Sequence, residues 1–143
     1  MEKTMKWITW ERIGIDRMAC SWLIKKYVDV SAEFVFIEKG SDYKGIDGIP
    51  FDIPGAALSH KRGKCTFCTI LKEYSLNDKT LDRMAEIVNS ADTINDLLPE
   101  PEAAGLDLVC RSISRFLNDD TKVIEQSFLI FESMYLYLGD KAQ

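Results

Sequence analysis

The sequence predicts an α+β fold, with a small sheet of three or four strands in the N-terminal half and four or five helices around it, most of them C-terminal. Three observations support this prediction. Short segments rich in aromatic and β-branched residues precede residue 60, and apolar residues at helical spacing dominate after residue 65. Glycines and prolines cluster between Gly40 and Gly63, which indicates turns and short strands there.

The N-terminal half is expected to open with a strand, a helix and a second strand. The helix covers Asp16–Val28, and its apolar residues go most of the way round, so we expect it to be mostly buried, with the Asp16 carboxylate capping its first N–H groups. The first two strands could form a parallel unit around it. The expected strands are Met5–Trp10, Glu33–Glu38, Ile49–Ile53 and a short Ala57–His60.

The C-terminal half is expected to be helical. Asn77 and Asp78 are possible caps of its second helix, and Gly139 is expected to end the last one. The helical segments are Cys65–Tyr74, Leu81–Val88, Leu106–Leu117 and Ile124–Leu138.

Length and charge limit the classes of protein to which the chain can belong. Its 143 residues match one domain, residues 1–143. A net charge of -5 and a pI of about 4.9 argue against binding to nucleic acid or to an anionic membrane. The N-terminus has no apolar core of a secretory signal, so we expect a cytoplasmic protein whose four cysteines are thiols or ligands rather than structural disulfides.

The segment from Ser59 to Thr69 is the strongest candidate for chemistry. His60, the one histidine, precedes Cys65 and Cys68 by five and eight residues. An imidazole and thiolates suit zinc or another borderline-soft ion. The candidate metals are zinc, iron and manganese. Since a structural site usually needs four ligands, we expect carboxylates to complete it. The predicted metal ligands are His60, Cys65, Asp52 and Asp92.

The same segment allows a thiol or oxyanion site. Cys65 and Cys68 form a C-x-x-C at a predicted helix N-terminus, where the dipole would lower the pKa of the Cys65 thiol. Helix N-termini and basic side chains also bind oxyanions, and the predicted contacts are Arg17, Arg62 and Lys64.

Several of these residues have a simpler structural interpretation. Cys20 and Cys110 lie on apolar helix faces, where thiols pack as small hydrophobes. Asp16 and Arg17 are either a helix cap and a surface charge or a polar pair in a pocket that Cys20 also lines. No Gly-rich phosphate loop is present, so no nucleotide cofactor is expected.

The segment from Ile15 to Ile24 reads I-D-R-M-A-C-S-W-L-I. It resembles the opening motif I-D-R-x-A-C-P-W-L-I of the chromate-resistance ChrB domain family. Further matches are Ala32–Phe34, Ile49–Gly55, Ser59-His60, Gly63–Phe67, Ala91–Thr93 and Ala104–Leu106. The resemblance implies a free-standing C-terminal domain, without the DNA-binding or rhodanese-like part of some members, and a role in chromate resistance. Ser21 and Val30 replace family prolines, and Cys68 replaces a residue that is more often Asp, so the C-x-x-C is not a family hallmark.

Three functions remain open from the sequence. The first is a metal- or oxyanion-binding domain of the chromate-resistance type, built around His60 and Cys65. The second is a cytosolic thiol-redox enzyme that uses Cys65 and Cys68. The third is a non-catalytic partner-binding module or homo-oligomer, whose face would be the last helix with Phe128, Phe131, Tyr135 and Tyr137.

Overall fold

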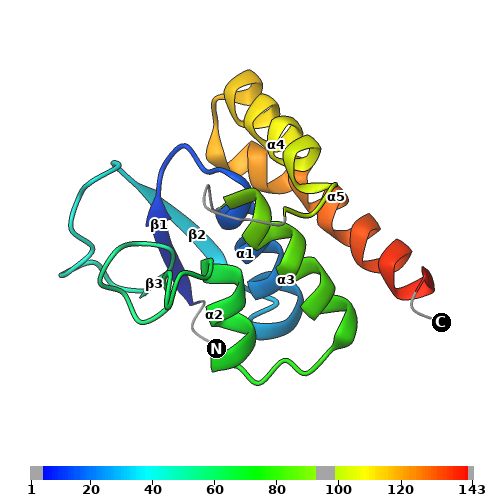
Figure 1. Ribbon diagram of the computed structural model, residues 1–143. Helices are drawn as coiled ribbons and strands as arrows, with labels where there is room; N and C mark the ends of the chain where they lie inside the picture. The colour runs from blue at the N-terminus through cyan, green and yellow to red at the C-terminus, as the bar shows by residue number, and fades with distance from the viewer. Residues whose placement is uncertain (1–4, 93–98, 142–143) are drawn as a thin grey trace.

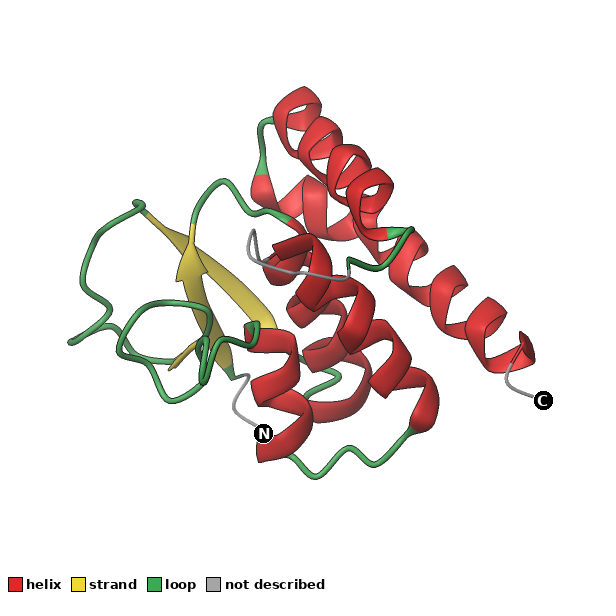
Figure 2. Cartoon of the chain, viewed as in Figure 1, coloured by secondary structure: helices red, strands yellow, loops and turns green. Residues whose placement is uncertain are grey.

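The computed structural model describes residues 5–92 and 99–141. The first four residues, which belong to the N-terminal segment predicted to carry no secretory signal, lie outside the described residues. The described residues form an α+β fold, as predicted, with a three-stranded sheet and five α-helices. The sheet lies at one side of the molecule and the helices at the other (Figures 1 and 2). The elements are β1 Lys6–Trp10, α1 Ile15–Leu23, the π-helical turn η1 Ile24–Val28, β2 Glu33–Ile37, β3 Ile49–Pro50, α2 Thr66–Glu73, α3 Lys79–Asp92, α4 Ala103–Leu117 and α5 Asp120–Lys141.

The sheet is parallel, in the order β2-β1-β3, with Ile8 paired to Val35 on one side and to Pro50 on the other. The predicted parallel β1-α1-β2 unit is therefore confirmed. The third strand is shorter than predicted because Asp52 has a left-handed φ of 53°, which turns the chain away from the sheet. The predicted strand Ala57–His60 is wrong: among the described residues, this segment contributes only an isolated bridge, between Phe51 and Leu58.

Helix α1 lies between the sheet and the other helices and packs against α2, α3, α4 and α5 (Figure 1). Eight of its nine residues are buried, which confirms the prediction of a mostly buried helix. Its N-cap is Gly14, which makes no side-chain capping bond. The predicted role of Asp16 as a cap of its own helix is therefore wrong, and its carboxylate serves another helix.

The remaining helices follow the predicted segments, with one difference at the C-terminus. The Asp78 carboxylate accepts the N–H groups of Thr80 at 2.8 Å and Leu81 at 3.3 Å, which confirms the predicted cap of α3. Gly139 does not end α5, which continues to Lys141. A single glycine costs a helix only about 1 kcal/mol, and contacts of α5 with α1, α3 and α4 outweigh it.

The predicted aromatic face of α5 is divided between core and surface. Phe131 is fully buried and packs against Trp22, with ring centroids 6.4 Å apart, and Tyr135 packs against the same ring at 6.0 Å. Phe131 is thus not available to a partner, contrary to the prediction, and Tyr135 is only partly exposed. The exposed apolar side chains of α4 and α5 are instead Leu108, Val109, Phe116, Phe128, Leu129, Leu136 and Tyr137. A homo-oligomer stays a prediction.

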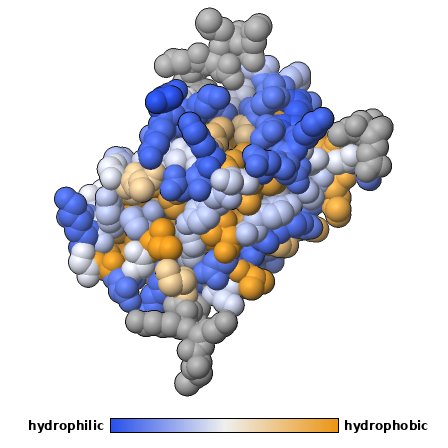
Figure 3. Space-filling model, turned by 90° about the horizontal axis from the view of Figure 1, so that it is seen from below, coloured by the Kyte–Doolittle hydropathy of each residue, from blue (hydrophilic) through white to orange (hydrophobic). Residues whose placement is uncertain are grey.

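Neither the hydropathy of the surface nor the length of the helices favours one of the three open functions. On the face in Figure 3, hydrophobic side chains are scattered among hydrophilic ones. None of the described helices is long and apolar enough to cross a membrane.

Candidate metal centre

Asp16 joins the first turn of α1 to the first turn of α2. The residue is only 3% exposed. Its Oδ2 accepts the Thr66 N–H at 2.9 Å, and its Oδ1 accepts the Phe67 N–H at 3.0 Å and the Cys20 thiol at 3.4 Å. A carboxylate at a helix N-terminus also interacts favourably with the helix dipole. The cap of α2 is therefore supplied by a different helix, which explains why a charged side chain can lie inside the protein.

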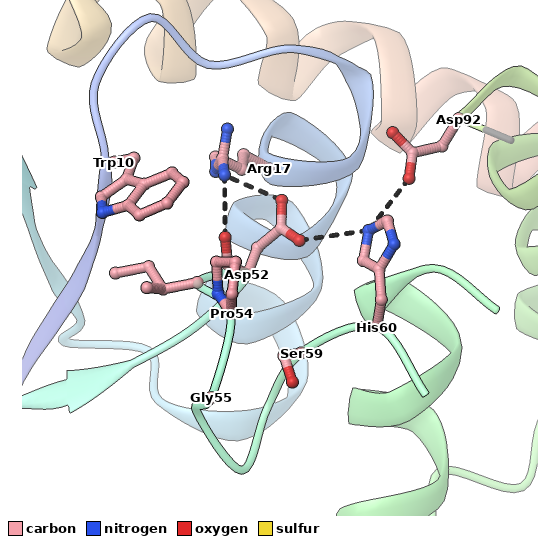
Figure 4. Close-up of a pocket in the computed structure, with 9 residues that line it drawn as sticks. Trp10, Arg17, Asp52, Pro54, Gly55, Ser59, His60 and Asp92 are labelled. Atoms are coloured by element: carbon pink, nitrogen blue, oxygen red, sulfur yellow. Dashed lines mark hydrogen bonds and ion pairs between the residues drawn. The ribbon is translucent and has the colours of Figure 1, made fainter. Parts of the chain in front are cut away.

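His60 lies in the loop before α2, and its Nε2 faces three carboxylates. The distances are 3.2 Å to Asp16 Oδ2, 3.3 Å to Asp52 Oδ1 and 3.0 Å to Asp92 Oδ2. Figure 4 shows the imidazole between Asp52 and Asp92. A single N–H cannot point at three oxygens. Among the described residues, Asp92 Oδ2 is a buried side-chain oxygen that no aligned hydrogen bond satisfies.

The crowding of charges shifts two pKa values. Hydrogen bonds to Asp16 and Asp52 raise the pKa of His60 to about 10, although burial opposes this change. Burial, with the nearby Asp16 charge second, raises the pKa of Asp92 to about 6. Three carboxylates thus share a partly buried space with one imidazole. A divalent cation would relieve this repulsion better than one proton.

The donor atoms of Asp16, His60 and Asp92 lie within 4.8 Å of one another, close enough to bind one metal ion. Cys65 does not belong to this group, which corrects the predicted ligand set. Its side chain is buried in the core, and its Sγ lies 3.5 Å from Cys68 Sγ. One imidazole nitrogen and carboxylate oxygens are donors suited to zinc, iron or manganese.

Asp52 lies beside this group and is held by its neighbours. Its Oδ1 accepts the Thr66 hydroxyl at 2.7 Å, and its Oδ2 lies 3.2 Å from Arg17 Nε. Arg17 also donates to the Asp52 carbonyl at 2.8 Å and to Thr9 Oγ1 at 3.1 Å, with Trp10 beneath its guanidinium. Arg17 therefore positions Asp52, and only part of its side chain remains open to an anion.

His60 and Asp92 of this group line a cavity of about 510 Å³. Trp10, Arg17 and Pro54 line it opposite His60 and Asp92 (Figure 4). Within the described chain, the predicted oxyanion contacts Arg62 and Lys64 are not part of its wall; they are exposed in the turn before α2. The predicted pocket residues Asp16 and Cys20 are buried.

The thiols differ from the prediction in their acidity. The hydrogen bond with Cys68, followed by burial, raises the pKa of Cys65, whereas the hydrogen bond from Cys65 lowers the pKa of Cys68. The predicted acidic thiol at Cys65 is therefore wrong, and Cys68 is the more acidic of the two. Cys110 is fully buried, as its predicted packing role requires.

The comparisons with known proteins agree with this chain's motifs. Residues 7–138 match the family described as "ChrB, C-terminal domain". The chain belongs to this family. A curated member, "Protein ChrB" of Cupriavidus metallidurans, is 27% identical over 135 residues, which cover 94% of this chain and 41% of that protein. The ChrB-type domain described here thus spans about two fifths of the length of this relative. No solved structure matches the chain.

Proposed function

We propose that this ChrB-type domain binds a divalent transition-metal ion through Asp16, His60 and Asp92, as part of a function related to chromate resistance. The observation that supports it most is the His60 Nε2 facing three carboxylates, together with the buried and unsatisfied oxygen of Asp92. Family membership supports the chromate-resistance context. Zinc, iron and manganese are the candidate ions.

Charge favours a cation over a free oxyanion as the first ligand. The carboxylates of Asp16, Asp52 and Asp92 outnumber the two nearby cations, His60 and Arg17. A doubly charged oxyanion would be repelled from this space. When a divalent ion takes the place of the His60 proton, the ion and Arg17 together balance the three carboxylates, and the cavity beside Trp10 and Arg17 gives an oxyanion room to approach the metal. Metal first and oxyanion second is therefore the order that the site supports.

Elemental analysis and calorimetric titration test this proposal. The protein is purified without added metal, then stripped with chelator and titrated with zinc, manganese and iron(II). We expect one ion per chain in the wild type and loss of binding in His60→Ala and Asp92→Asn. Asp82→Asn is the matched control, since it removes the same charge from an exposed position of α3. Equal binding by Asp92→Asn and Asp82→Asn, or no binding by the wild type, would contradict the proposal.

Chromate is added in a second titration. We expect chromate to bind the metal-loaded wild type more tightly than the metal-free protein, because the bound cation neutralises the negative charge of the site. Tighter binding to the metal-free form would show that the oxyanion has a separate site.

A further inference from the structure

The cysteine pair at the start of α2 lies outside the proposed metal group but directly against its support. Cys65 is the N-cap of α2, and Cys68 lies in its first turn. Both are free thiols with sulfur atoms 3.5 Å apart, Cys65 buried and Cys68 half-buried. A disulfide requires about 2.05 Å between the sulfurs, so the gap to close is small.

The residues between the two cysteines are the ones that bind Asp16. The N–H groups of Thr66 and Phe67 donate to the two oxygens of its carboxylate. The Cys65 N–H is itself fixed by Asn89 Oδ1 at 2.8 Å. A bond between residues 65 and 68 would therefore act directly on the turn that carries these two donors, and we expect it to shift them. Asp16 is the proposed ligand that would move with them.

We propose that Cys65 and Cys68 are a redox-modification site. A low-molecular-weight disulfide such as glutathione disulfide oxidises the pair to a reversible Cys65–Cys68 bond. This bond weakens metal binding through Asp16. The effect on metal affinity rests on the metal function proposed above, whereas formation of the disulfide does not. The lowered pKa of Cys68 and its partial exposure make it the attacking thiol.

The reaction proceeds by thiol–disulfide exchange. The Cys68 thiolate attacks one sulfur of glutathione disulfide and releases one glutathione thiolate. The Cys65 sulfur then attacks Cys68 in the mixed disulfide and releases the second glutathione. Two electrons pass from the cysteine pair to the glutathione disulfide, and the two thiol protons end on the two released glutathione molecules.

The disulfide is tested on the full chain without metal. Reduced protein is equilibrated with glutathione and glutathione disulfide at several ratios, alkylated and mapped by peptide mass spectrometry. We expect a Cys65–Cys68 bond whose fraction rises with the disulfide ratio, in the wild type and equally in Cys110→Ser, which lacks a distant buried thiol. Cys68→Ser should form none. Thiols that stay reduced at every ratio, or a reaction that stops at a glutathione adduct on Cys68, would overturn the proposal.

The link to Asp16 has a readout that needs no metal. Because the chain has one histidine, NMR signals from an imidazole belong to His60 alone. We expect these signals to shift between the reduced and disulfide forms of the metal-free protein. We also expect zinc affinity to fall about 10-fold on oxidation, the effect typical of losing support for a ligand. Unchanged imidazole signals and unchanged zinc affinity would refute the link.

The two proposals fail in different ways. If the reduced protein binds no zinc, manganese or iron, the metal function is refuted. Disulfide mapping and the imidazole signals still decide whether the cysteine pair acts on the Asp16–His60 contact.

Discussion

The stability of the metal-free protein should depend on pH through His60. Contacts with Asp16 and Asp52 raise the pKa of His60 from 6.5 to about 10 in the folded state. A group whose pKa rises on folding adds stability that is complete below the unfolded pKa. This stability is lost as the pH rises through the folded pKa. The contribution of His60 should therefore be complete below about pH 6.5 and absent above about pH 10.

The size of the effect follows from the two pKa values and from exposure. The interval between 6.5 and about 10 corresponds to about 5 kcal/mol for a group shielded from water. The His60 side chain is 50% exposed, so solvent screens its contacts with the carboxylates. We therefore expect a contribution of about 2 kcal/mol to the free energy of unfolding.

Urea unfolding, followed by tryptophan fluorescence, measures this contribution. Wild type and His60→Gln are compared in chelator between pH 7 and pH 10, where Asp92, with a pKa of about 6, is mostly ionised in the wild type. Lysines, tyrosines and thiols titrate in both proteins, so the difference between them isolates His60. We expect this difference to fall by about 1.5 kcal/mol across the range, which covers most of the transition. A difference that stays constant with pH would show that the carboxylates do not stabilise the charged imidazole.

Three further changes test the support of the site and the core. Asp16→Ala should lower the free energy of unfolding by about 2–4 kcal/mol, because it leaves two backbone N–H groups of α2 without their acceptor. A loss below about 0.5 kcal/mol, measured by urea unfolding, would contradict the role of Asp16 as the cap of α2. Phe131→Ala should cost about 3–5 kcal/mol in the same assay, whereas Leu129→Ala, at a side chain 73% exposed, should change stability by less than about 0.5 kcal/mol. Gly139→Ala should stabilise α5 by about 0.5–1 kcal/mol, because alanine has the higher helix propensity. The new methyl group would lie at an ordinary contact distance of 3.6 Å from Thr80 Oγ1. A lower melting temperature would refute this prediction.

Local patterns predicted most of the fold. The strands β1 and β2 and the helix between them are visible in the sequence because side-chain spacing reports which face is buried. The short third strand was not predictable in this way. It ends where Asp52 adopts a left-handed φ, and this conformation depends on the Arg17 and Thr66 contacts rather than on neighbouring residues.

The candidate site was predictable in part. Residue type singles out His60, Asp52 and Asp92, and the structure brings them together. The sequence leaves Asp16 open as a local cap or as part of a polar pair in a pocket, although a carboxylate in an otherwise apolar helix is itself a signal of a buried partner. Spacing from His60 predicts Cys65 as a ligand. Spacing does not say that a side chain at the N-cap of α2 turns into the core, towards Cys68.

The proposed ligands come from three separated parts of the chain: the central helix α1, the loop before α2, and the end of α3. No short fragment contains all three, so an unfolded chain offers no comparable site. Metal supply would then act on the lifetime of the protein as well as on its function, since an ion that binds only the folded state reduces the population open to proteases. Cells short of the metal would degrade this domain faster, and its abundance would follow the concentration of its own ligand.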